Sequence, residues 1–147
     1  MLAPVNCLVF SQAGDGVPLP RIAAQAAAHF SGLGVSAHPT NPVCVLVTSQ
    51  GVEASVTLSA RPATPLDLER ARAAEERGRA GGMSDLAARC PTVWVVTFEG
   101  EPPPALGLEF CALLASVALG PILPEDGSTL LGVRSARTRA EAARRAP

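Results

Sequence analysis

Three strand-like segments limit the possible folds of this chain more than any other feature, because they show two different hydrophobic patterns. Segments 5–11 and 92–98 are apolar almost without interruption, which is typical of strands covered on both faces. Segment 52–59 alternates instead, so one side of that strand is polar. The polar side consists of Glu53, Ser55, Thr57 and Ser59. The chain therefore needs a sheet with two interior strands and one strand whose polar side faces water or a partner.

The order of the remaining segments predicts the fold class. Strands are expected at 5–11, 43–48, 52–59, 92–98 and 129–133, and helices at 20–32, 65–79 and 105–120. This β-α-β-β-α-β-α-β order predicts an α+β fold, with a ferredoxin-like split βαβ unit that a C-terminal α-β unit extends. Right-handed crossovers then give a mixed five-stranded sheet in the order 4-1-3-2, with the fifth strand outside the fourth.

The length of 147 residues fits one domain, which we assign to residues 1–135. Residues 136–147 carry four arginines and a single acidic residue, Glu141, so we expect a frayed or disordered Arg-rich tail.

Composition excludes several classes of function. The net charge of -1 argues against general nucleic-acid binding, which needs a basic excess. All 12 basic residues are arginine, so a lysine-dependent phosphate loop and a pyridoxal Schiff base are both excluded. Gly14 and Gly16 are followed by Pro18 and Pro20, which stand where a dinucleotide-binding loop would open into a helix. We therefore expect no cofactor. The Arg-, Ala- and Pro-rich composition favours a bacterial source.

The cysteines and the longest apolar segment indicate a reduced, cytoplasmic protein. Cys7, Cys44, Cys90 and Cys111 form no CxxC pair, so neither a metal site nor a disulfide framework is expected. The N-terminus shows no basic start followed by a long apolar run, as a secretory signal would. The apolar segment 105–123 contains Glu109 and is broken by a proline, so it reads as a core helix and no membrane association is expected.

The predicted topology gathers ionisable residues at one end of the sheet. His38 and Asn41 precede the second strand, Arg61 follows the third, and Glu99 and Glu101 follow the fourth. Such a group could bind a small charged ligand or perform acid–base chemistry.

Two further residues on apolar segments invite a prediction. Glu109 joins the candidate site, because it lies near the start of the apolar helix beside a stripe of small residues. Trp94 lies between two valines of an interior strand and is expected to be buried and structural.

These observations favour a non-enzymatic binding or regulatory module that self-associates through the polar side of segment 52–59, with a protein partner also possible. The alternative is a small enzyme, a hydrolase or isomerase, that uses His38 with Glu99 or Glu101.

Overall fold

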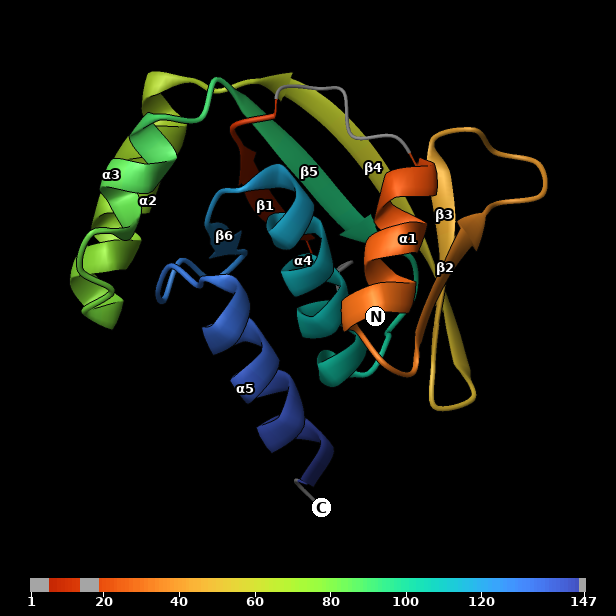
Figure 1. The fold of residues 1–147 in the computed structure, drawn as a ribbon. Helices are drawn as coiled ribbons and strands as arrows, with labels where there is room; N and C mark the ends of the chain where they lie inside the picture. The colour runs from red at the N-terminus through yellow and green to blue at the C-terminus, as the bar shows by residue number, and fades with distance from the viewer. Residues whose placement is uncertain (1–5, 14–18, 146–147) are drawn as a thin grey trace.

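In the computed structural model, the described strands form one antiparallel sheet of six in the order β2-β3-β4-β5-β1-β6 (Figure 1). The structure describes residues 6–13 and 19–145, so the Gly14–Gly16 loop lies outside the described residues. The strands are β1 (Asn6–Ser11), β2 (Leu33–Ala37), β3 (Cys44–Ser49), β4 (Val52–Pro62), β5 (Thr92–Phe98) and β6 (Ile122–Pro124). The helices are α1 (Leu19–His29), α2 (Pro65–Gly78), α3 (Met83–Ala88), α4 (Pro104–Ala118) and α5 (Val133–Arg145).

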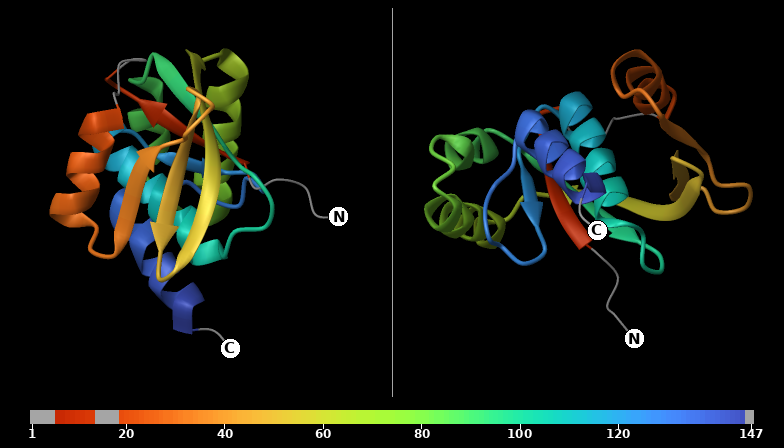
Figure 2. Two further views of the ribbon diagram at one scale, coloured as in Figure 1. Left: turned by 90° about the vertical axis from the view of Figure 1, so that its right-hand side faces the viewer. Right: turned by 90° about the horizontal axis from the view of Figure 1, so that it is seen from below.

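Helices α1, α4 and α5 cover one face of the sheet (Figures 1 and 2). Alternate residues of the strands point toward these helices, as the two-residue period of a strand requires. Val9 of β1, Val56 of β4 and Val96 of β5 are fully buried there against Phe110 and Leu113 of α4. Helix α4 is apolar on nearly all sides because it lies between the sheet and α5.

The opposite face is covered only in part. Phe10 of β1 and Val93 of β5 point to this side and pack with Ala71 and Ala74 of α2 and Ala87 of α3. The small alanines let both helices approach the ends of these strands closely. Farther along the sheet, β3 and β4 have no helix in front of them, as the left view of Figure 2 shows.

The α+β class is confirmed, but the strand order is not ferredoxin-like. In a ferredoxin-like sheet, β1 would separate β4 from β5 and those two strands would be parallel. Here β4 and β5 are antiparallel neighbours, with Val56 opposite Phe98 and Arg61 opposite Val93. Helices α2 and α3 therefore form an excursion between two paired strands instead of a crossover past β1.

Two segments differ from their expected local structure. No strand was expected over residues 33–37, but Gly32 adopts a positive φ of 86° and the chain returns as β2 along β3. Conversely, segment 129–133 was expected to be a strand, but its Leu131 forms only an isolated bridge with Ile122 of β6. Both differences concern edge strands, which are short and carry little hydrophobic pattern.

Helix boundaries follow local chemistry. Thr64 caps α2 in the expected manner: its hydroxyl accepts the Asp67 N–H, and the Asp67 carboxylate accepts the Thr64 N–H.

The C-terminal segment differs from the frayed or disordered tail expected over 136–147, because residues 133–145 form α5. Ala136 and Ala140 of α5 are fully buried, so α5 packs against α4 through a stripe of small residues.

Candidate functional site

A groove with a volume of about 700 Å³ lies on the partly covered face of the sheet, between α2, strands β1 and β5, and the loop that follows β6. Its lining combines three guanidinium groups, two carboxylates and an apolar floor. The lining residues are Cys7, Leu8, Arg61, Arg70, Ala73, Arg77, Val95, Leu123, Pro124, Glu125, Asp126 and Gly127.

Helix α2 supplies the basic wall of the groove. Arg70, Ala73 and Arg77 follow one another at spacings of three and four residues, so they share one stripe of the helix. Arg77 is tied down, because its Nη1 donates a hydrogen bond of 3.0 Å to the carbonyl oxygen of Gly127. Arg70 is exposed and has no hydrogen bond or ion pair with any residue in the described part of the chain. Its guanidinium is therefore free to meet a ligand.

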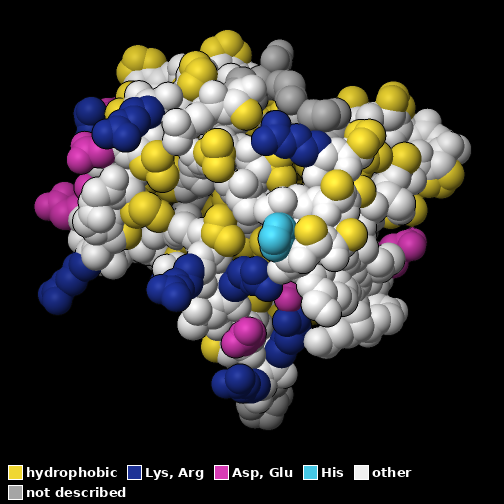
Figure 3. All heavy atoms as spheres, in the orientation of Figure 1, with side chains coloured by type: hydrophobic (Ala, Val, Ile, Leu, Met, Phe, Trp, Pro, Cys, Tyr) yellow, Lys and Arg dark blue, Asp and Glu magenta, His cyan; other side chains and the backbone are white. Residues whose placement is uncertain are grey.

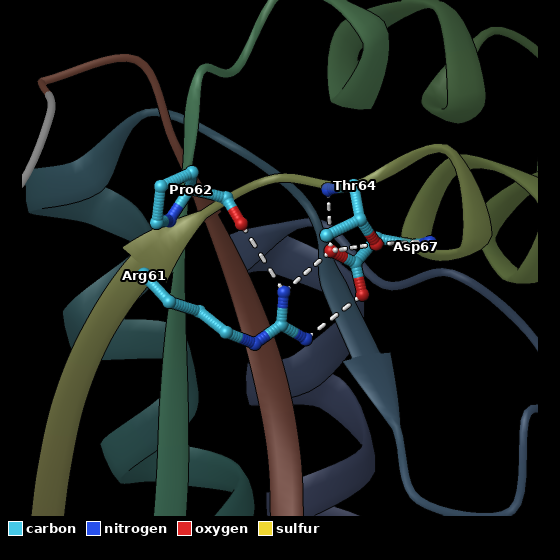
Figure 4. Close-up of polar contacts among 4 residues, drawn as sticks. All are labelled: Arg61, Pro62, Thr64 and Asp67. Carbon is cyan, nitrogen blue, oxygen red and sulfur yellow. Dashed lines mark hydrogen bonds and ion pairs between the residues drawn. The ribbon is translucent and has the colours of Figure 1, made fainter.

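Arg61, at the end of β4, is held by Asp67 of α2 (Figure 4). Its Nη1 lies 2.6 Å from Oδ2 and its Nη2 lies 2.9 Å from Oδ1, which is the paired geometry that guanidinium and carboxylate groups favour. Nη1 also donates to the carbonyl oxygen of Pro62 at 3.3 Å. These contacts use three N–H groups of the guanidinium, which has five. The remaining N–H groups belong to a side chain that is already fixed beside the groove.

The environment of Asp67 keeps this pair charged. The hydrogen bonds from Arg61 lower the pKa of Asp67 to about 2, and those from the Thr64 N–H and hydroxyl act in the same direction, while burial opposes them. The Asp67 side chain is only 3% exposed, whereas that of Arg61 is 39% exposed. The pair thus joins a buried carboxylate to a guanidinium that solvent reaches from the groove.

The opposite wall is acidic and belongs to the loop after β6. Glu125 and Asp126 are both exposed there. Asp126 Oδ1 accepts the backbone N–H of Ser128 at 3.0 Å, and this hydrogen bond lowers the pKa of Asp126. The floor between the two walls is formed by the partly exposed side chains of Leu8 and Val95. The groove therefore has a basic side and an acidic side across an apolar strip.

A second, smaller cavity of about 210 Å³ is almost wholly apolar and contains two cysteines. Cys7 of β1 and Cys111 of α4 are both buried, and their thiols share a hydrogen bond. This hydrogen bond, followed by burial, raises the pKa of Cys7 well above its ordinary value. Both effects keep the Cys7 thiol neutral, and a neutral thiol is a poor nucleophile.

His38 and Asn41 lie together, but their polar groups organise the loop between β2 and β3. His38 Nδ1 accepts the backbone N–H of Thr40 at 3.2 Å and that of Asn41 at 3.0 Å. Asn41 Oδ1 accepts the N–H of Val43 at 3.1 Å. One ring nitrogen of His38 is thus engaged by the backbone.

The antiparallel register separates the other residues that the sequence placed at one end of the sheet. Ala37, Val45, Val56 and Phe98 form one row across the strands, so β2 and β5 lie three strand spacings apart, about 14 Å. His38 and Glu99 leave this row in opposite directions, because β2 and β5 run antiparallel. Along the strand pair, Arg61 lies five residues beyond that row, roughly 17 Å away.

Neither predicted acid of the β5–α4 loop joins this group. Glu99 donates its backbone N–H to Ser55, and the Glu101 side chain is exposed without a partner in the described part of the chain. The expected end-of-sheet site is therefore not assembled, and of its members only Arg61 lines the groove.

Glu109 faces α5. Its Oε1 pairs with Nη2 of Arg144, and its Oε2 is buried without a hydrogen-bond partner among residues 6–13 and 19–145. The covered face seen in Figure 3 shows basic side chains gathered over α5, with acidic side chains among them. Glu109 therefore contacts the C-terminal helix, and it lines neither of the two cavities described above.

Sequence reasoning missed the side chains that line the groove apart from Arg61. Arg70 and Arg77 lie in a run of charges that resembles an ordinary solvated helix face. A usable signal was present: two arginines seven residues apart share one helical stripe with a small alanine between them. In such a stripe the two arginines supply positive charge, and the small alanine between them leaves space for a ligand.

Comparison of the chain with protein-family models, curated proteins and solved structures gave no match. No three His, Cys, Asp or Glu side chains in the described ranges lie close enough together to hold a metal ion. None of the described helices combines the length and the apolarity that crossing a membrane requires.

Proposed function

We propose that this protein is a non-enzymatic binding or regulatory module that self-associates through the uncovered face of β3 and β4. The observation that carries the proposal is the partial covering of the sheet, with three helices on one face and no helix over these two strands on the other (Figure 2).

The chemistry of this open face suits contact with a second copy. Ser59 is exposed, Ser55 and Thr57 are partly exposed, and Leu46 lies beside Ser55 in the register of β3 and β4. Glu53, near the start of β4, adds a charge only at the margin of the face. Protein interfaces are depleted of charge at their centre, and two sheets stack at a spacing of about 10 Å. Ser55 Oγ is buried and Thr57 Oγ1 contacts Cys44 Sγ, so the exposed Ser59 hydroxyl is the group available to hydrogen-bond with the second copy.

The enzymatic alternative gains no support from the arrangement of the residues it needs. It requires His38 beside Glu99 or Glu101, but these residues follow strands β2 and β5, which lie three strand spacings apart, and His38 Nδ1 is engaged by the backbone of its own loop. The groove and the open face instead present surfaces for binding.

The proposal is tested by placing a charge in the open face. In Ser59→Arg, association would bury an unpaired guanidinium, which opposes dimerisation strongly. Ser135→Arg is the matched control, because Ser135 is also exposed but lies on α5, away from this face. Light scattering over a range of concentrations measures the mass of each protein.

We expect the wild type and Ser135→Arg to form dimers at micromolar concentration, and Ser59→Arg to dissociate at least tenfold more readily, a change of about 1.4 kcal/mol. A wild type that stays monomeric at high micromolar concentration, or a Ser59→Arg variant that dimerises as well as the control, would contradict the proposal. Circular dichroism establishes that all three proteins are folded.

A further inference from the structure

We propose that the groove beside α2 binds a small amphiphile whose oxyanion, a carboxylate or a phosphate, meets Arg70 and Arg61 and whose apolar body lies over Leu8 and Val95. This inference rests on the proposed function and names the class of ligand that the binding module takes. It depends on the groove residues Arg70, Arg61, Leu8 and Val95, which border the open face because Ser59 lies opposite Val95 in register.

The oxyanion position follows from the two guanidinium groups near the first turns of α2. Arg70 is exposed and unpaired within the described ranges, so it can turn toward a ligand. Arg61 keeps N–H groups that Asp67 and Pro62 do not use, and the contacts with Asp67 already fix its side chain. Guanidinium groups bind carboxylate and phosphate oxygens in pairs, and a fixed side chain loses less conformational freedom when it binds.

The apolar body follows from the floor. Leu8 of β1 and Val95 of β5 are neighbours in register and both remain partly exposed, because neither α2 nor the loop after β6 reaches over them. The small side chain of Ala73 on α2 leaves this apolar strip uncovered. A volume of about 700 Å³ lies within the range found for sites that take small organic ligands.

The acidic wall fixes the orientation of the ligand. Glu125 and Asp126 repel an anion from the far side of the groove. Arg77 lies near that wall, where its guanidinium already donates to Gly127. The oxyanion is therefore directed to the end formed by Arg61 and Arg70, with the apolar body extending toward the loop after β6.

The test measures binding of defined probes to the full chain by isothermal titration calorimetry. The probes are octyl phosphate, octanoate, inorganic phosphate and 1-octanol, each below the concentration at which it forms micelles or separates from solution. The test variant is Arg70→Gln. The matched control is Arg72→Gln, because Arg72 is an exposed arginine of the same helix that does not line the groove.

We expect octyl phosphate or octanoate to bind at least tenfold more tightly than inorganic phosphate and than 1-octanol. Arg70→Gln should weaken that binding at least tenfold, and Arg72→Gln less than twofold. The stronger of the two amphiphiles identifies the oxyanion as a phosphate or a carboxylate.

Three results would each overturn the inference: no binding of either amphiphile at millimolar concentration, equal losses in Arg70→Gln and Arg72→Gln, or 1-octanol binding as tightly as the amphiphiles. The mass of the wild-type protein, measured separately, distinguishes failure of this inference from failure of the proposed self-association. A protein that dimerises but binds no probe contradicts only the ligand proposal.

Discussion

Replacing Asp67 with asparagine tests the contact that fixes Arg61 beside the groove. The asparagine has the same shape but no charge, and its amide nitrogen turns an N–H donor toward a guanidinium that can only donate. One of the two short contacts, from Arg61 Nη1 to Oδ2 at 2.6 Å or from Nη2 to Oδ1 at 2.9 Å, must then be lost.

The size of the effect follows from the pKa of Asp67. The difference between about 2 in the folded protein and the ordinary 3.8 corresponds to ~2.4 kcal/mol at neutral pH. Because the Arg61 side chain is 39% exposed, solvent screens the pair and reduces this contribution to roughly 1–2 kcal/mol. We expect Asp67→Asn to lower Tm by roughly 2–8 °C, since 1 kcal/mol shifts Tm by about 2–4 °C in a domain of this size.

The dependence on pH has a definite sign. The pKa of Asp67 is lower in the folded state than in the unfolded state, so its contribution is fully present above about pH 4 and is lost as the pH falls toward 2. Asp67→Asn has no carboxylate at this position and lacks that part of the acid titration. The difference in stability between wild type and variant should therefore be largest at neutral pH and shrink below pH 4.

Urea denaturation at pH 7, 5, 4, 3 and 2.5, followed by circular dichroism, measures this difference. Asp85→Asn is the control, because Asp85 is exposed on α3, and its free energy of unfolding should change by less than ~0.5 kcal/mol. A difference between wild type and Asp67→Asn that stays constant from pH 7 to pH 2.5 would refute the role given to the Arg61–Asp67 pair.

Three other substitutions test the packing. Trp94→Ala should cost ~3–5 kcal/mol in urea denaturation, because Trp94 is buried between the sheet and its helices, and an unchanged midpoint would show that it is not packed. Gly120→Ala should cost ~3 kcal/mol or more, since a Cβ there would lie 2.0 Å from the Phe10 carbonyl oxygen. Gly81→Ala, with open space around the added methyl, is its control, and equal melting temperatures would contradict the close approach. Glu109→Gln should cost about 1 kcal/mol and speed hydrogen exchange in the last turn of α5, whereas unaltered exchange would mean that the contact with Arg144 does not hold this helix.

The interior of the fold could be predicted from the sequence, because burial leaves a strong pattern. The uninterrupted apolar segments became β1 and β5, the alternating segment became β4, and the capping residues around Thr64 set the start of α2. The edges could not be predicted in the same way. Strand β2 contains Gly34 and Ser36 and is short, so its pattern resembles that of a loop.

The strand order was the decisive failure for the site. Local patterns do not state which strands pair, and the ferredoxin-like order placed Arg61 and Glu99 at the same end of the sheet. The observed antiparallel pairing of β4 with β5 places these two residues at opposite ends of the sheet. Arg61 lies opposite Val93 at the start of β5, whereas Glu99 follows the end of β5. The groove was missed for the same reason, because Arg70 and Arg77 gain a floor only when α2 is placed beside β1 and β5.

Cross-linking from the open face tests the proposed self-association most directly. In Ser59→Cys, the introduced thiol is exposed whereas the four native cysteines are buried, so a short photoreactive maleimide labels position 59 selectively. After illumination at micromolar concentration, peptide mass spectrometry of the dimer band identifies the attachment points. The account predicts attachment to β3, β4 and β5 of the second copy. Attachment to α1, α4 or α5, or a sample that yields no dimer band, would contradict it.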